Sequence, residues 1–280
     1  MQTPTIALSQ DQIDFYQQEG YLTLPAITTS EEVTWLREIY DRLFAAQAGR
    51  EEGNQFDLAG ADEEGKVATL PQILNPRKYA PELAEGLFRV NALAVARQLL
   101  GPEAQSGGEH AILKPARYGA PTPWHQDEAY WSPDLQYNSI SIWIPLQEAT
   151  VQGGCMQFVS KSYAAEVQPH HPINNDPRIH GLEADHIPAE QIVPCPIPAG
   201  GATIHHCRTF HYAGPNLSDE PRRAYILIFA LPTEMRSEKR IFPWQALQQT
   251  ARMERKKQAA FSVLQKHAPT LKNAPLSGDN

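Results

Sequence analysis

The sequence predicts an α+β protein, mainly β, built around a sandwich or barrel of strands. Segments with helical periodicity come first, many short segments that alternate apolar and polar residues follow, and a last helical segment comes near the end, as expected for this class. The 24 prolines and 17 glycines favour short strands and shaped loops over a helical bundle. With 280 residues, of which 41% are hydrophobic, the chain is long enough to bury the core of one such domain.

Two helices and one strand are predicted for the first part of the chain. Ser9 is placed to cap a short helix, with Gln12 at the capping-box position. The alternating stretch YLTLP at 21–25 then predicts a strand. A longer helix is expected next, with either Thr29 or Ser30 as its N-cap. Its apolar stripe consists of Val33, Leu36, Ile39, Tyr40 and Leu43.

Two further segments complete this helical part, which extends to about residue 105. Residues 49–65 are acidic and glycine-rich, and we interpret them as a surface loop, with a flexible flap near a site as the functional alternative. The segment 82–102 has helical periodicity and ends at Gly101 and Pro102, which predicts an amphipathic helix.

A strand-rich core is predicted for about residues 106–233. Apolar and polar residues alternate, with β-branched side chains, in several short segments. These segments are 109–115, 138–149, 153–159, 201–216 and 222–232. We expect the last two to be strands joined by a turn at Gly214, Pro215 and Asn216, so that the second strand returns beside the first.

A proline- and histidine-rich stretch of about 164–199 interrupts these strands and is long for a connection in a compact domain. Long loops of this kind are often lids or binding loops, so we expect this one to cover the mouth of the active site and to set substrate choice. A basic helix of about 243–267 follows the core, and its charged residues are interpreted as a solvated face.

Composition excludes several classes of partner and location. The net charge of −8, with a pI near 5.7, argues against nucleic acid and mildly against a strongly anionic substrate, unless the local charge of a pocket reverses that. Three cysteines without a CxxC spacing indicate neither a disulfide framework nor a zinc knuckle. No run of about 18 apolar residues predicts a membrane span, and no secretory signal is recognisable, so the cytoplasm is the expected location.

The segment PWHQDEAYW at 123–131 raises the question of function. Alternate residues of a strand point to the same side, so His125 and Asp127 would project together if the segment is extended. They are then either two metal ligands or two polar residues on a wet strand face. A third ligand is needed, and the candidate is His211, at the end of a predicted strand just before a turn.

Two histidines and one carboxylate can occupy one face of an octahedral metal and leave three positions open. This arrangement suits non-haem Fe(II) that binds an organic co-substrate together with dioxygen, whereas zinc more often takes thiolates or a third histidine. Eleven residues after His211 comes Arg222, whose planar fork suits the far carboxylate of a dicarboxylate co-substrate. Its neighbour Arg223 should point to the opposite face.

With these residues in place, the sequence resembles the phytanoyl-CoA dioxygenase family of Fe(II)- and 2-oxoglutarate-dependent oxygenases. The similarity covers most of the chain, from the N-terminal helix to the segment RRAYILIFALP. The segments that carry it are WHQD at 124–127, SIWIPL at 141–146, GGCMQFV at 153–159 and HYAGPNLSDEPRRA at 211–224. Together these segments are specific, although any one of them alone is not.

The resemblance implies a single oxygenase domain over residues 1–280, with a double-stranded β-helix, or jelly roll, as its core and flanking helices at both ends. It implies Fe(II), 2-oxoglutarate and O2 as cofactor and co-substrates. The residues that match the family's iron ligands are His125, Asp127 and His211. Arg222 matches the co-substrate arginine, and Trp143 matches a position that often lies against the co-substrate, with a place in the core as its alternative.

The implied reaction is oxidation, most simply hydroxylation, of an unactivated C–H bond, with release of succinate and CO2. The substrate would be a small organic molecule such as a secondary metabolite, an amino-acid derivative or an acyl compound. Candidate substrate contacts, each with a purely structural alternative, are His110, Lys114, Tyr130 and Trp131. The identity of the substrate, desaturation or rearrangement in place of hydroxylation, and the oligomeric state stay open.

The chain departs from the family pattern at two places. The family usually has Ser or Thr two residues after the last histidine, where this chain has Ala213, and it often has Pro-Gly-Ser-His where this chain has SKSY at 160–163. These changes are the support for a second hypothesis, a non-catalytic jelly-roll protein that binds metal or ligand. A metal-dependent hydrolase or isomerase on a cupin barrel is a third, although Arg222 argues against it. Asp127 favours hydroxylation over halogenation, because halogenating relatives have a small residue there.

Overall fold

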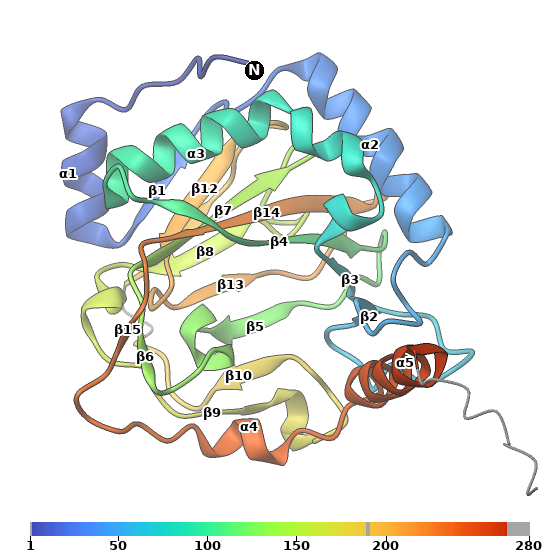
Figure 1. Cartoon of the computed structure of the whole chain (residues 1–280). Coiled ribbons are helices and arrows are strands. Elements are labelled where there is room, and N and C mark those ends of the chain that lie inside the picture. Colours follow the sequence, from blue (N-terminus) through green and yellow to red (C-terminus); the bar gives the residue numbers. More distant parts are fainter. Residues whose placement is uncertain (1, 189–190, 268–280) are drawn as a thin grey trace, which may run out of the picture.

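The computed structural model describes residues 2–188 and 191–267, and its core consists of two antiparallel sheets that face each other (Figure 1). The larger sheet has the order β1-β12-β7-β14-β4-β3-β2 and the smaller β11-β8-β13-β5. The strands of the larger sheet are, in that order, Tyr21–Leu24, Ala202–His206, Ser139–Pro145, Arg222–Ala230, Gln105–Lys114, Pro71–Leu74 and Gln55–Asp57. Those of the smaller sheet are Ile192–Cys195, Met156–Val159, His211–Ala213 and Thr122–His125. This architecture confirms the predicted jelly roll.

Short elements complete the β region. Two small pairs flank the main sheets, β10 (Leu182–Ala184) with β9 (His170–Pro172) and β15 (Glu234–Met235) with β6 (Leu135–Gln136). Single turns of 3-10 helix are Pro76–Lys78, Pro81–Glu85, Asp127–Tyr130, Ser162–Ala164 and Ile173–Asn175.

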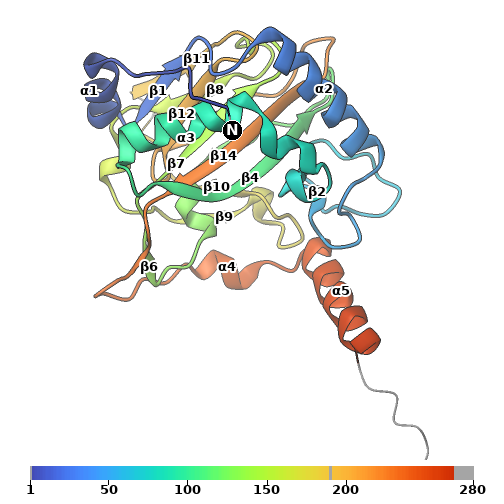
Figure 2. The ribbon, with the colours of Figure 1, turned by 45° about the horizontal axis from the view of Figure 1, so that its top comes forward.

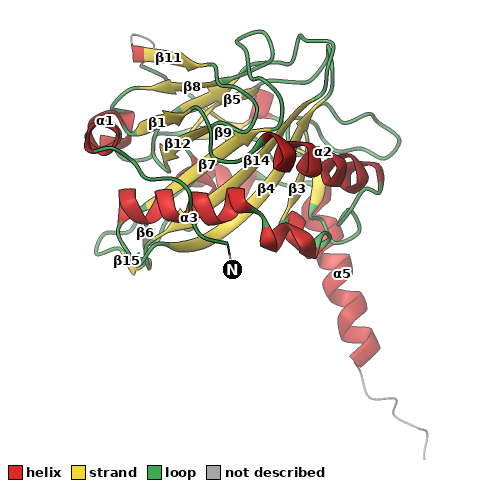
Figure 3. Ribbon diagram, turned by 90° about the horizontal axis from the view of Figure 1, so that it is seen from above, coloured by secondary structure: helices red, strands yellow, loops and turns green. Residues whose placement is uncertain are grey.

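Three helices near the N-terminus cover the outer side of the larger sheet (Figures 1 and 3). They are α1 (Gln10–Glu19), α2 (Ser30–Ala45) and α3 (Leu87–Leu100). The expected capping box of α1 is present, because the Ser9 side chain accepts from the Gln12 backbone and the Gln12 side chain accepts from the Ser9 backbone. Thr29 is the N-cap of α2, and the predicted apolar stripe of that helix is buried.

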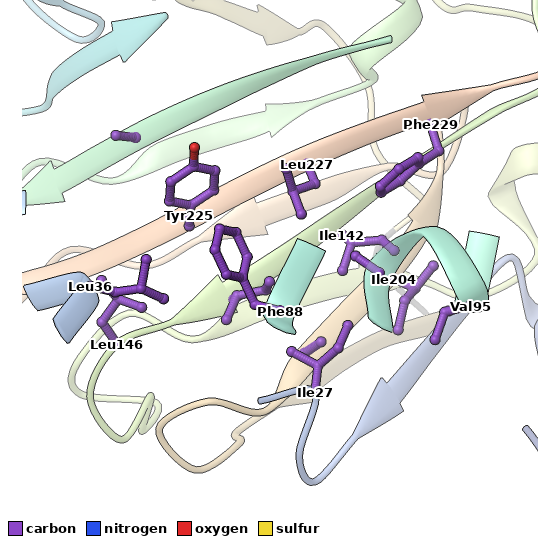
Figure 4. Packing of buried hydrophobic residues seen from close by; sticks show 14 of the residues in the cluster. Ile27, Leu36, Phe88, Val95, Ile142, Leu146, Ile204, Tyr225, Leu227 and Phe229 are labelled. Atoms are coloured by element: carbon purple, nitrogen blue, oxygen red, sulfur yellow. The ribbon is translucent and has the colours of Figure 1, made fainter. Parts of the chain in front are cut away.

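The main hydrophobic core lies between these helices and the larger sheet. From β14 it contains Tyr225, Leu227 and Phe229. Figure 4 shows Phe88 of α3 beside Tyr225, and Val95 of α3 beside Ile204 of β12. Burial of each such side chain stabilises the fold by about 1.5–3 kcal/mol. Because alternate residues of a strand face opposite sides, these odd-numbered residues of β14 leave the even-numbered ones, from Arg222 onward, for the space between the two sheets.

The structure differs from the sequence predictions at the second half of the core. The segment 201–216 forms two strands, β12 and β13, which belong to different sheets. β14 pairs with β4 and β7 and not with β13, so the expected hairpin is wrong. The connection after β13 crosses between the sheets instead, and Asn216 holds it by donating to the carbonyls of Lys114 and Pro115.

Three segments that were predicted to be loop or helix also differ from that prediction in the structure. The predicted surface loop 49–65 contains the buried strand β2, where Phe56 is 1% exposed. The long stretch 164–199 contains β9, β10 and β11. The C-terminal helix is divided into α4 (Pro243–Leu247) and α5 (Ala251–His267), because Gln248 has an extended backbone (Figure 2). Within the described residues, no helix has both the length and the apolar character to cross a bilayer.

Candidate metal centre

Two histidines meet on the face of the smaller sheet that lines a cavity between the two sheets. His125 ends β5 and His211 begins β13, and the two stand opposite each other in the antiparallel register, with ring centroids 4.1 Å apart. An extended HxD segment would have kept Asp127 in the strand, but the strand ends at His125. Asp127 begins a 3-10 turn after the extended Gln126, whose amide is held by Arg208 and Gln168. That turn directs the carboxylate back toward the two histidines.

The three side chains form a cluster with the dimensions of a metal site. The Asp127 Oδ1 lies 3.8 Å from His125 Nε2 and 3.5 Å from His211 Nε2. The three candidate ligand atoms all lie within 4.8 Å of one another. The Nδ1 of His125 is 2.8 Å from the Pro123 carbonyl and that of His211 is 2.9 Å from the Thr209 carbonyl. Donation from Nδ1 leaves the Nε2 lone pair of each ring free to bind a metal.

The charge states of the cluster suit a divalent cation. Burial, followed by the neighbouring His211, lowers the pKa of His125 well below its usual value, so its ring is neutral. Burial raises the pKa of Asp127, but the interactions with His211 and His205 outweigh it and hold that pKa well below its usual value. A neutral imidazole and a carboxylate are the forms that bind metal.

Two residues that sequence reasoning did not place in the site contact the second carboxylate oxygen. Ser141 donates to Asp127 Oδ2 at 2.6 Å, and His205 Nε2 lies 3.4 Å from the same oxygen. Ser141 and His205 are partners in register on β7 and β12. As consecutive residues of β12, His205 faces the cavity and His206 is buried against Tyr163. No local spacing links Ser141 to His205, so only the strand pairing reveals them.

Arg222 lies in the same cavity as an isolated buried cation. Its side chain is 2% exposed, and its Nε and Nη1 have no hydrogen-bond partner in the described part of the chain. Its guanidinium carbon is 5.3 Å from the centre of the Trp143 ring. Burial lowers its pKa to about 10, so it keeps its charge at neutral pH. Arg223 points outward, as expected, and pairs with Asp41 on α2.

A cavity of about 360 Å³ connects the histidine–aspartate cluster with Arg222. Three of the four predicted substrate contacts, His110, Tyr130 and Trp131, line this cavity. Lys114 does not line it: its Nζ donates to the carbonyls of Ala213 at 2.8 Å and Gly214 at 2.6 Å. Lys114 therefore has a structural role and not the predicted contact with the substrate. It lies at the end of β4 and donates to the connection that crosses between the two sheets.

The two departures from the family pattern have different consequences. Ala213 lines the cavity, and Thr122, its partner in register on β5, also lines it and brings a hydroxyl to that wall. The SKSY segment turns away from the cavity toward α1, where the Tyr163 hydroxyl donates to the Gln17 carbonyl. The altered loop therefore serves the packing of the N-terminal helix.

A jelly roll that combines two histidines, one carboxylate and a buried unpaired arginine in one cavity defines the class of non-haem iron oxygenases that use 2-oxoglutarate. Comparison with known proteins makes the assignment narrower. The model of the phytanoyl-CoA dioxygenase (PhyH) family matches residues 16–224, and the chain belongs to this family. It is an Fe(II)- and 2-oxoglutarate-dependent dioxygenase, with O2 as the second co-substrate.

Several relatives support this assignment. EvdO2 from Micromonospora carbonacea var. aurantiaca, solved in complex with 2-oxoglutarate, is 38% identical, with 87% of this chain and 99% of that chain covered and a TM-score of 0.73. A probable alpha-ketoglutarate-dependent hypophosphite dioxygenase from Stutzerimonas stutzeri is 25% identical, covering 77% of this chain and 76% of the relative. An L-proline trans-4-hydroxylase from Streptomyces griseoviridis is 28% identical, covering 76% and 82%.

Proposed function

We propose that this dioxygenase hydroxylates an unactivated C–H bond of a small organic molecule. Substrate, O2 and 2-oxoglutarate would yield hydroxylated product, succinate and CO2. The observation that carries the proposal is the buried guanidinium of Arg222, which has no partner for its Nε and Nη1 in the described chain and lies in the cavity lined by the metal cluster. A buried charge without a partner is costly, so its partner is expected to be a ligand.

In this proposal His125, Asp127 and His211 hold Fe(II), through the two Nε2 atoms and a carboxylate oxygen. The bound iron, with 2-oxoglutarate and O2, supplies the oxidising power. Arg222 binds the far carboxylate of 2-oxoglutarate through parallel charge-assisted hydrogen bonds, and Trp143 flanks that contact.

The remaining wall of the cavity orients the substrate and excludes water. Tyr130, Trp131, Ile226 and Ile228 line it with aromatic and aliphatic surface. The volume of about 360 Å³ favours a small molecule, such as a secondary metabolite, an amino-acid derivative or an acyl compound. Relatives named for dioxygenation of hypophosphite and ectoine and for hydroxylation of L-proline support a small substrate. Asp127 favours hydroxylation over halogenation.

The long stretch 164–199 contributes to substrate choice in this proposal. His180 and Leu182 come from it and line the cavity, and the Tyr130 hydroxyl accepts a hydrogen bond from the Leu182 backbone. Exchange of this stretch for that of a relative should change which substrate is oxidised. An exchange that leaves the substrate range unaltered would contradict this assignment.

An anaerobic titration of Fe(II) and 2-oxoglutarate tests the proposed site directly. Chelation of Fe(II) by 2-oxoglutarate should produce a weak visible charge-transfer band in the wild-type protein. We expect His125→Ala and Arg222→Ala to lose the band, and Arg223→Ala to keep it, because Arg223 lies on the outer face of the same strand. A wild-type protein that binds iron without forming the band would refute the proposed arrangement.

A further inference from the structure

We propose that Arg252 binds an anionic group of the substrate, a carboxylate, at a part of the cavity separate from Arg222. The inference rests on the proposed function and narrows its substrate class to small monocarboxylates with an apolar body.

The positive and negative charges in the cavity do not balance, and Arg252 is the cation without a counterpart. The residues with ordinarily charged side chains that line the cavity are Asp127, Arg222 and Arg252. Bound Fe(II) and the two arginines carry four positive charges, whereas Asp127 and 2-oxoglutarate carry three negative charges. Among the described residues that line the cavity, one positive charge therefore has no counterpart until the substrate binds. This local charge reverses the mild argument against an anionic substrate that the net charge of −8 provides.

Arg252 is held in place by contacts that do not neutralise it. It lies in the first turn of α5, beside β2 (Figure 1). Its Nε donates to the Gly53 carbonyl at 2.9 Å, and its guanidinium carbon is 5.0 Å from the centre of the Phe56 ring. In the described chain no carboxylate lies within ion-pair distance of it, whereas Arg255, one turn further along, pairs with Asp62. Burial and then Arg255 lower the pKa of Arg252, as expected for a cation without an acidic neighbour.

A second polar group without a partner lies in the same wall. The Nδ1 of His180 is buried and has no hydrogen-bond partner among the described residues. Burial, followed by the charge of Arg252, lowers the pKa of His180 to about 3, so the ring is neutral and can donate one hydrogen bond. Gln248 fixes this segment by donating to the His180 carbonyl at 2.8 Å.

The chemistry of the ligand follows from these donors. A guanidinium and a neutral imidazole together recognise a group with several acceptor oxygens and one negative charge. A carboxylate meets that description, whereas a phosphate monoester carries closer to two charges and exceeds the single surplus. The apolar side chains of Tyr130, Leu182 and Ile228 line the same cavity and would contact the body of the substrate.

Matched pairs of acids and amides test the inference. We would titrate octanoate against octanamide and 3-phenylpropanoate against its primary amide, under anaerobic conditions, and follow the shift of the Fe(II)–2-oxoglutarate band. In the wild type the acids should bind about ten- to hundredfold more tightly than the amides, as expected for a charge-assisted contact. Arg252→Gln should abolish this preference and Arg252→Lys should retain much of it. The control Arg255→Gln should behave as the wild type, because Arg255 is already paired.

The outcomes separate this inference from the proposed function. A wild-type protein that forms no band refutes the proposed function and this inference with it. A normal band combined with equal affinity for acids and amides, with no binding of either, or with a preference that survives Arg252→Gln, overturns the assignment of Arg252 alone.

Discussion

The hydroxyl of Ser141 donates a hydrogen bond of 2.6 Å to the Oδ2 of Asp127. This contact occupies one carboxylate oxygen and leaves Oδ1 as the atom that faces the Nε2 atoms of His125 and His211. Because Ser141 is on β7 and Asp127 follows β5, the contact joins the larger sheet to the turn that carries the carboxylate. The larger sheet therefore orients a ligand that belongs to the smaller one.

Removal of this hydroxyl should weaken metal binding. In Ser141→Ala the carboxylate loses the partner that orients it, and we expect Fe(II) affinity to fall about tenfold to a hundredfold, as is usual for groups that orient metal ligands. Anaerobic titration against a competing chelator measures this. Ser139→Ala is the matched control, since that hydroxyl lies on the same strand but donates to the Phe229 carbonyl. Equal iron affinities for Ser141→Ala and Ser139→Ala would contradict the assigned role.

Replacement of Arg222 should stabilise the ligand-free protein and abolish its response to 2-oxoglutarate. Arg222→Met removes a buried charge whose Nε and Nη1 lack partners in the described structure, so the melting temperature without ligand should rise by roughly 2–4 °C for each kcal/mol gained. When both proteins are already loaded with iron, 2-oxoglutarate at a hundred times its Kd should stabilise the wild type further, by about 2.7 kcal/mol, and leave the variant unchanged. Thermal unfolding with and without ligand measures both effects.

Arg223→Met is the control for that experiment. It removes an ion pair with the largely exposed Asp41, which contributes about 0–1 kcal/mol, and should keep the stabilisation by 2-oxoglutarate. A ligand-free Arg222→Met protein that melts well below the wild type would show that Arg222 has a structural partner.

Replacement of Lys114, unlike that of Arg222, should destabilise the ligand-free protein. Lys114→Met leaves the buried carbonyls of Ala213 and Gly214 without these donors and should lower the free energy of unfolding by about 1–3 kcal/mol. Urea denaturation measures the loss, and Lys78→Met, which breaks a surface pair with Glu52, should change stability by less than about 1 kcal/mol. Unchanged stability with loss of 2-oxoglutarate binding would instead place Lys114 in the ligand site.

Local patterns in the sequence were sufficient for several parts of this structure. The capping box at Ser9 and the stripe from Val33 to Leu43 depend on neighbours within one or two turns, and both are present. The opposite directions of Arg222 and Arg223 follow from strand alternation alone. These features needed no knowledge of which strands pair.

Features that depend on pairing between distant strands were missed or misplaced. The partner strands of β14, and the contact of Ser141 and His205 with Asp127, are set by a sheet whose neighbours are far apart in sequence. The 3-10 turn at Asp127 depends on Gln126, which bonds to the backbone of Arg208 and Gln168. No periodicity within the segment 123–131 records those contacts.

Buried neutral histidines should make the metal-free protein lose stability in mild acid. His170 has a pKa lowered to about 4, and those of His180 and His206 are lowered to about 3, in each case mainly by burial. Between the unfolded value, about 6.5, and these folded values, the unfolded state binds more protons than the folded state. The contribution of these histidines to the free energy of unfolding is therefore fully present above about pH 6.5. It falls as pH decreases, by up to about 1.4 kcal/mol per pH unit for each histidine.

His206→Asn isolates one of these histidines away from the proposed metal ligands. The asparagine oxygen can replace His206 Nδ1 as acceptor for the Arg208 backbone N–H, while the ionisable group is removed. Urea unfolding of the metal-free protein at pH 7 and pH 5 should show that the variant loses less stability than the wild type, by roughly 2 kcal/mol. Equal losses in the two proteins would mean that the His206 ring becomes protonated in the folded state as readily as in the unfolded chain, and its burial beneath Tyr163 would then have no electrostatic consequence.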